Sequence, residues 1–173
     1  FLKELREYTS LLKSDFALVG ETLHGDYNTW MNDSACHGVT NYECYKGLYS
    51  SFNTGNMHEI SYSLNRQFGQ EQWCLYTGKH LLNFVDNHDV SRIATVLNNN
   101  EHIKPIYGLL FGMPGVPAIY YGSEWGVLGS KSDGDPALRP GIEKPEWNDL
   151  SDWIMKLAKA KKESPALCYG SYR

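Results

Sequence analysis

The stretch LLNFVDNHDV, residues 81–90, places an amide, an imidazole and a carboxylate soon after a short apolar run. The run Leu81–Val85 has no helical period and is typical of a strand that is buried on both faces. Asn87, His88 and Asp89 then crowd the C-terminal end of this strand. Burying three such side chains costs free energy unless they have a function, such as binding or proton transfer. On this stretch alone, an ordinary Asx-type turn explains them equally well.

Two further apolar segments end in the same way, and they favour a functional interpretation. The stretch FALVGETLHGDY begins with Phe16–Val19 and reaches Glu21 after one glycine. The stretch PAIYYGSEWG carries Ala118–Tyr121 and then Glu124. In parallel α/β folds, ligands bind and catalytic groups gather at the C-terminal ends of the strands. Three strands that each deliver a carboxylate at the same end therefore predict one shared site.

The elements that must position these groups alternate along the chain. Apolar residues that recur three and four positions apart indicate helices, and short apolar runs between turn residues indicate strands. Strands are predicted near residues 16–20, 37–41, 81–86 and 117–121, and helices near 1–12, 43–52, 59–68, 103–111 and 149–162. This order predicts a run of right-handed α/β crossovers around one parallel sheet. The 173 residues suffice for a single domain with its own core.

Composition and charge narrow the function classes. A formal net charge of −4, with a single short basic run at residues 159–162, argues against nucleic acid as a partner. No apolar run approaches the length of a membrane span. The four cysteines lack CxxC and zinc-ligand spacings, so we expect reduced thiols, with two disulfides as the open alternative. We expect no metal and no cofactor. The chain opens with FLKELREYTSLL and no signal peptide, and we expect a cytoplasmic protein.

At these residues the chain resembles the C-terminal half of an α-amylase superfamily catalytic barrel (glycoside hydrolase family 13), closest to the cyclomaltodextrinase and neopullulanase type. VGETLH resembles the segment that carries the general acid after the fifth strand, and FVDNHD resembles the F-x-x-N-H-D segment after the seventh. GMPGVPAIYYGSEWG resembles the eighth strand with its flanks, and GDPALRP resembles a D-P-x-x-R loop that clamps a glucose. The resemblance implies half of a TIM (β/α)8 barrel, with four parallel strands, fifth to eighth, and outer helices over residues 1–173.

The resemblance also implies roles for individual side chains. Retaining glycoside hydrolysis needs one carboxylic acid to protonate the leaving oxygen and one carboxylate to attack the anomeric carbon. Glu21 matches the acid. Asp89 matches a carboxylate that stabilises the oxocarbenium-like transition state electrostatically. The implied substrate-binding residues are His24, Asn87, His88, Asp135 and Arg139.

Two other charged residues near the motifs have open interpretations. Arg92 either pairs with Asp89 or another site carboxylate, or is a plain surface arginine. Glu124 either makes a supporting hydrogen bond behind the site or forms a salt bridge in its loop.

The superfamily's nucleophile segment, G-x-R-x-D after the fourth strand, does not occur in the sequence. The resemblance therefore implies part of a longer enzyme that hydrolyses or transfers α-glucosidic bonds of starch-derived oligosaccharides, and a segment that is inactive alone. One alternative is a non-catalytic, amylase-like sugar-binding domain. Another is a flavodoxin-like domain for a phosphorylated ligand, although the glycine-rich turn that it needs is missing. Bond specificity stays open.

Half of a barrel has two unpaired sheet edges and an uncovered apolar inner face. Unpaired strand edges and large apolar patches favour association with another chain. We expect a two-fold homodimer through these half-barrel edges, with strand 16–20 of one copy near strand 117–121 of the other.

Overall fold

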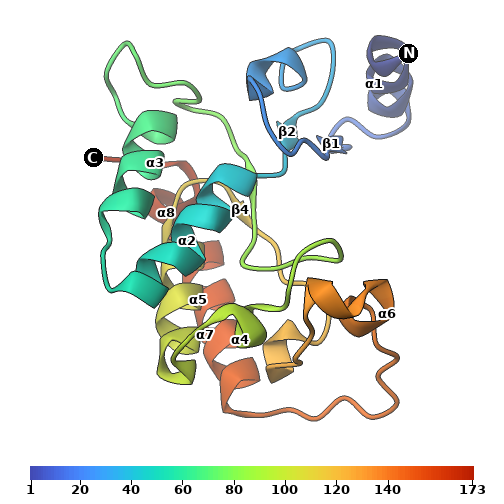
Figure 1. The fold of residues 1–173 in the computed structure, drawn as a ribbon. Helices are drawn as coiled ribbons and strands as arrows, with labels where there is room; N and C mark the ends of the chain where they lie inside the picture. Colours follow the sequence, from blue (N-terminus) through green and yellow to red (C-terminus); the bar gives the residue numbers. More distant parts are fainter.

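The computed structural model describes residues 1–173, and most of its regular structure is helical, with four very short parallel strands (Figure 1). The helices are α1 (Leu2–Leu12), α2 (Tyr42–Thr54), α3 (His58–Phe68), α4 (Ile93–Val96), α5 (Ile103–Gly112), α6 (Asp135–Leu138), α7 (Asp149–Glu163) and α8 (Pro165–Tyr169). The strands are β1 (Val19–Gly20), β2 (Gly38–Val39), β3 (Leu82–Asn83) and β4 (Val116–Pro117). Single 3-10 turns are η1 (Tyr27–Thr29), η2 (Asn100–His102), η3 (Ser123–Trp125) and η4 (Lys131–Asp133).

The strands pair in parallel and in the order of the chain. β1 pairs with β2, and β3 pairs with β4. A parallel bridge between Thr40 and Leu82 joins β2 to β3, and the Asn41 N–H donates to the Leu82 carbonyl at 2.9 Å. Direction and order agree with the sequence-based prediction and describe part of a parallel barrel.

The strands are much shorter than predicted. Each spans two residues, and the last begins at Val116, one residue before the predicted 117–121. The predicted burial of the strand after residue 80 is confirmed for Leu81 and for residues 83–85. The segment that leads into β1 is not buried in this way, since Phe16 is 42% and Val19 is 51% exposed. Only Val19 and Gly20 of the first segment have ladder partners, which lie on β2, and no residue of this chain pairs with the outer edge of β1.

The helices α2, α3, α5, α7 and α8 lie together on one side of the strands (Figure 1). α2 packs against α3 and α5, α5 packs against α7, and α7 packs against α8. The long helices begin and end within two residues of the predicted bounds. Ile106, Tyr107 and Leu110 show why α5 packs here, since their three-to-four spacing aligns them on one fully buried face.

Helix α1 forms as predicted but lies apart from this helical layer (Figure 1). Leu2 and Leu5 are partly buried, but the C-terminal apolar side chains stay uncovered, with Leu11 at 85% and Leu12 at 69% exposure. Arg6 ties the helix to the following loop by donating to the carbonyls of Asn32 at 2.8 Å and Ala35 at 3.0 Å. The amphipathic pattern therefore predicts the helix correctly, although this chain covers its apolar face only in part.

A buried group of side-chain amides connects β3 to the segment after β2 and to α3. Asn41 Nδ2 donates to Gln67 Oε1 and to Asn83 Oδ1, both at 2.8 Å, and Gln67 Nε2 donates back to Asn41 Oδ1 at 3.1 Å. Asn83 Nδ2 donates to the Pro114 carbonyl at 2.7 Å, just before β4. The three amides are fully buried, and the contacts among them offset the cost of their burial.

All four cysteines are free thiols, so the two disulfides that the sequence leaves open do not form in this structure. None of the helices combines the length and the apolar content that a bilayer crossing requires.

Candidate active site

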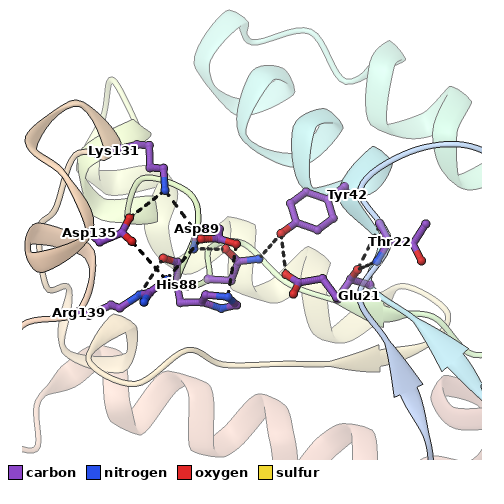
Figure 2. Close-up of polar contacts among 10 residues, drawn as sticks. Glu21, Thr22, Tyr42, His88, Asp89, Lys131, Asp135 and Arg139 are labelled. Carbon is purple, nitrogen blue, oxygen red and sulfur yellow. Dashed lines mark hydrogen bonds and ion pairs between the residues drawn. The ribbon is translucent and has the colours of Figure 1, made fainter.

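The segments that follow β1 and β3 bring Glu21, His88 and Asp89 to one place (Figure 2). Glu21 comes directly after β1, whereas His88 and Asp89 follow β3 by a few residues. A carboxylate oxygen of each acid and a ring nitrogen of His88 all lie within 4.8 Å of one another. The two acids are exposed and His88 is half-buried. The structure thus places these three side chains together, while their chemical roles remain predictions.

A cavity of about 350 Å³ opens beside them, lined in part by Glu21, Asn87 and His88. Phe84 and Tyr120 supply apolar ring surface to the same cavity, which suits the apolar face of a sugar as well as any core contact. Two larger cavities, of about 600 and 790 Å³, lie near the C-terminus and contain none of the predicted site residues.

A chain of hydrogen bonds links the backbone of Asp89 to the carboxylate of Glu21 (Figure 2). The Asp89 N–H donates to Asn87 Oδ1 at 2.8 Å, and Asn87 Nδ2 donates to the Tyr42 hydroxyl oxygen at 2.9 Å. The Tyr42 hydroxyl donates to Glu21 Oε1 at 3.1 Å. Burial raises the pKa of Tyr42, so its hydroxyl keeps the proton that it donates.

Tyr42 is a residue that the sequence reasoning missed. It begins α2 and comes three residues after β2, at the same end of the strands as the other site residues. The rule that polar groups after parallel strands form one site would have found it, had it been applied to the second strand.

Three charged side chains, Lys131, Asp135 and Arg139, gather around Asp89 on the side away from Glu21 (Figure 2). Arg139 lies 3.5 Å and Lys131 lies 3.8 Å from Asp89 Oδ1, and His88 Nε2 lies 3.4 Å from Asp89 Oδ2. Asp135 pairs with Lys131 at 3.1 Å and with Arg139 at 3.7 Å. The hydrogen bond from Lys131, helped by the charges of Lys131 and Arg139, lowers the pKa of Asp135. Pairs this exposed add little to stability, so the arrangement mainly fixes charges in space.

The short distances among Glu21, His88 and Asp89 are also compatible with metal ligands. However, Lys131 and Arg139 stand beside Asp89, and their positive charges oppose a cation there. Electrostatics therefore favours a polar, uncharged ligand over a metal ion.

Two residues near the motifs do not join this cluster. His24 is exposed and lines a separate groove of about 650 Å³, which it shares with Tyr42. Its predicted contact with substrate remains a prediction. For Glu124, both interpretations are wrong, because its Oε2 is buried without a hydrogen-bond partner and its carboxylate forms no salt bridge. The short turn η3 directs this side chain inward.

Both interpretations of Arg92 are also wrong. The side chain is 0% exposed and donates to the carbonyls of Tyr121 and Leu138, far from a surface position and without contact to Asp89. The sequence also missed Asp86, which is 2% exposed and accepts hydrogen bonds from Ser123 Oγ and a backbone N–H. Burial raises the pKa of Asp86.

Comparison with known proteins gives the family. The family model for the alpha-amylase catalytic domain matches residues 1–166. This chain belongs to that family.

Curated alpha-amylase family relatives align along nearly the whole chain. Neopullulanase 2 of Thermoactinomyces vulgaris is 29% identical over 177 residues, covering 100% of this chain and 30% of the relative. The intracellular maltogenic amylase of Bacillus subtilis strain 168 is 26% identical and covers 96% of this chain and 28% of the relative. The chain therefore spans about a third or less of the length of these relatives.

Solved structures confirm the alpha-amylase catalytic fold. The crystal structure of CldA, described as a cyclomaltodextrin glucanotransferase with a three-domain ABC distribution, superposes with a TM-score of 0.82 at 22% identity. The match covers 98% of this chain and 36% of that one. The short parallel strands and outer helices thus form part of this family's barrel.

Proposed function

We propose that this alpha-amylase family chain supplies the general acid and a second carboxylate to the active site of a retaining glycoside hydrolase that acts on α-glucan oligosaccharides. The observation that carries the proposal is the convergence of Glu21, His88 and Asp89 within 4.8 Å beside a cavity. The names of the relatives, neopullulanase and maltogenic amylase, fit such a substrate.

In the proposed mechanism, Glu21 gives its proton to the glycosidic oxygen while the bond to the anomeric carbon breaks. The hydroxyl of Tyr42 holds the Glu21 carboxyl in place. Positive charge then develops on the sugar ring, and the fixed negative charge of Asp89 stabilises it. Arg139, paired with both Asp89 and Asp135, holds Asp89 in position and offers further donors to sugar hydroxyls. His88 and Asn87 supply hydrogen bonds from the same strand end.

The attacking carboxylate is not among these groups. We propose that residues 1–173 correspond to the fifth to eighth strands of the barrel, and that the nucleophile belongs to the half that precedes them. On this proposal the 173-residue segment alone has no practical turnover, since the covalent intermediate cannot form.

The proposed setting is cytoplasmic, which the intracellular relative supports. Substrate is the expected partner. The net charge of −4 offers no attraction for nucleic acid.

The test uses the full-length protein that carries this segment, incubated with maltotriose and with a cyclic maltodextrin. The proposal expects hydrolysis or transfer in which the newly formed anomeric centre keeps the α configuration in proton NMR. Release of the β anomer would contradict the retaining mechanism. Binding of maltotriose without any turnover would favour the non-catalytic alternative.

A matched pair of variants locates the acid. Glu21→Gln should abolish measurable turnover, whereas Glu124→Gln makes the same carboxylate-to-amide change at a residue outside the cluster and should leave the rate nearly unchanged. Equal rates for the two variants would remove Glu21 from the mechanism.

A further inference from the structure

Arg92 is fully buried, and its guanidinium connects three segments of the chain. Nη1 donates to the Tyr121 carbonyl at 2.6 Å and to Ser123 Oγ at 3.1 Å, while Nη2 donates to the Leu138 carbonyl at 2.7 Å. The guanidinium carbon lies 4.1 Å from the centre of the Tyr120 ring. A buried cation is costly unless acceptors surround it; here both Nη atoms have acceptors and the Tyr120 ring faces the guanidinium, whereas Nε has no hydrogen-bond partner.

Asp86 supplies the negative charge that balances Arg92, and the Ser123 hydroxyl connects the two side chains. The Ser123 hydroxyl accepts from Arg92 and donates to Asp86 at 2.7 Å. The planar, forked guanidinium can serve two carbonyls and a hydroxyl at once, which a lysine ammonium on a flexible stem cannot reproduce.

The segment 129–138, which contains η4 and α6, is attached to Arg92 at both of its ends. The Arg92 backbone N–H donates to the Gly129 carbonyl at 2.9 Å, and its side chain holds the Leu138 carbonyl. The two ends also touch, because a Cβ at Gly129 would lie 2.3 Å from the Ala137 oxygen. The residue directly after Leu138 is Arg139.

We propose that Arg92 is a positioning residue that anchors the segment 129–138 and thereby fixes Arg139 against Asp89. Arg92 makes no contact with Asp89 itself, so its effect on the site passes through this segment. The inference rests on the proposed glycoside hydrolase function and extends it to a side chain that no substrate would touch.

A double-mutant cycle in the full-length protein tests this route. Arg92→Lys should lower kcat/KM on maltotriose by about 10- to 100-fold, as misplacement of a binding group typically does. In an Arg139→Ala background the same change should cost less than about twofold, because the group that Arg92 positions is already gone. The melting temperature should fall by a similar amount in both backgrounds, since the structural cost does not depend on Arg139. Losses of kcat/KM that multiply in the double variant would overturn the proposal.

Arg6→Lys is the matched control, because Arg6 also donates to two loop carbonyls but lies in α1. It should leave kcat/KM unchanged within about twofold. If Arg92→Lys does not fold, Ser123→Ala removes the hydroxyl that accepts from Arg92 Nη1 at 3.1 Å and so weakens the hold on the same guanidinium. Its smaller loss should likewise vanish in the Arg139→Ala background, and a loss that persists there would overturn the proposal.

Amide hydrogen exchange separates this inference from the proposed function. Peptides covering residues 129–139 should exchange faster in Arg92→Lys than in the wild type, while peptides of α2 and α3 keep their rates. Unchanged exchange in 129–139 would overturn the anchoring. Absence of turnover in the wild type would reject the proposed function and leave the exchange comparison to decide the anchoring.

Discussion

Replacing Tyr42 by phenylalanine removes one hydroxyl from the middle of the chain that connects Asp89 to Glu21. The variant loses the donor to Glu21 Oε1 at 3.1 Å and the acceptor for Asn87 Nδ2 at 2.9 Å. The ring can stay in place, because it packs edge-on against Phe84 with centroids 4.9 Å apart. The perturbation is therefore confined to the two hydrogen bonds.

The expected magnitude follows from the type of bond that is lost. A hydrogen bond between uncharged groups contributes about 0.5–1.5 kcal/mol, and we expect the upper end of that range because the variant loses two hydrogen bonds. About 1.5 kcal/mol corresponds to roughly a tenfold loss in kcat/KM. The loss should fall mainly on kcat, since the bond orients the acid rather than holding the substrate.

The assay compares two substrates in the full-length protein. Maltotriose has a poor leaving group that needs the proton of the acid, whereas a nitrophenyl maltoside leaves readily without it. Tyr42→Phe should therefore slow maltotriose cleavage about tenfold and nitrophenyl release much less.

Tyr45→Phe is the control for this experiment, because Tyr45 stacks on the same Phe84 ring but its hydroxyl makes no hydrogen bond within the protein. The reasoning is refuted if the two tyrosine variants behave alike, or if Tyr42→Phe slows both substrates equally.

Further expectations concern chemistry, pH and assembly. Asp89→Asn should reduce kcat by about a thousandfold or more in the full-length protein, because a preorganised charge at the reacting sugar is lost, and a near-normal rate would exclude this role. Burial raises the pKa of Tyr27 to about 12, so its contribution to stability is complete below about pH 10 and is lost as the pH rises toward that value. Tyr27→Phe should therefore lessen the drop in unfolding free energy between about pH 9 and about pH 11 by about 1 kcal/mol, as urea titrations can measure, and an identical drop in both proteins would contradict this. The isolated 173-residue segment should form a two-fold dimer, because Phe16 and Val19 at one sheet edge and Val116 and Tyr121 at the other are exposed. A stable monomer in light scattering at micromolar concentration would contradict the dimer.

Features that depend on local sequence were predicted well. The helices follow from apolar spacing, and the convergence of Glu21, His88 and Asp89 follows from one geometric rule about parallel strands. The extent of the strands was not predictable in the same way. Apolar runs such as Phe16–Val19 specify a strand only where a neighbour supplies hydrogen bonds, and β2 pairs with only Val19 and Gly20 of this segment.

Long-range polar contacts escaped the sequence reasoning for a different reason. Arg92 is charged and follows a polar motif, so its sequence context suggests an ion pair at the site or a place at the surface. Its actual acceptors come from residues about 30 to 46 positions further along the chain. Only the folded arrangement of η3 and α6 reveals that these acceptors surround a buried guanidinium. Asp86, whose partner Ser123 lies 37 positions further along the chain, is a similar case.

The buried amides Asn41, Gln67 and Asn83 have a consequence for how the strands find their alignment. Two-residue strands share too few ladder bonds to define one pairing strongly against its neighbours. A shift of one residue in the register between the β2 and β3 segments would turn Asn83 to the opposite face. Its amide partners would then lack hydrogen bonds, at a cost of about 1–3 kcal/mol for each unsatisfied group. These three side chains thus penalise misaligned intermediates during folding. The native register is the one that places Glu21, Tyr42 and Asp89 together at the same end of the strands.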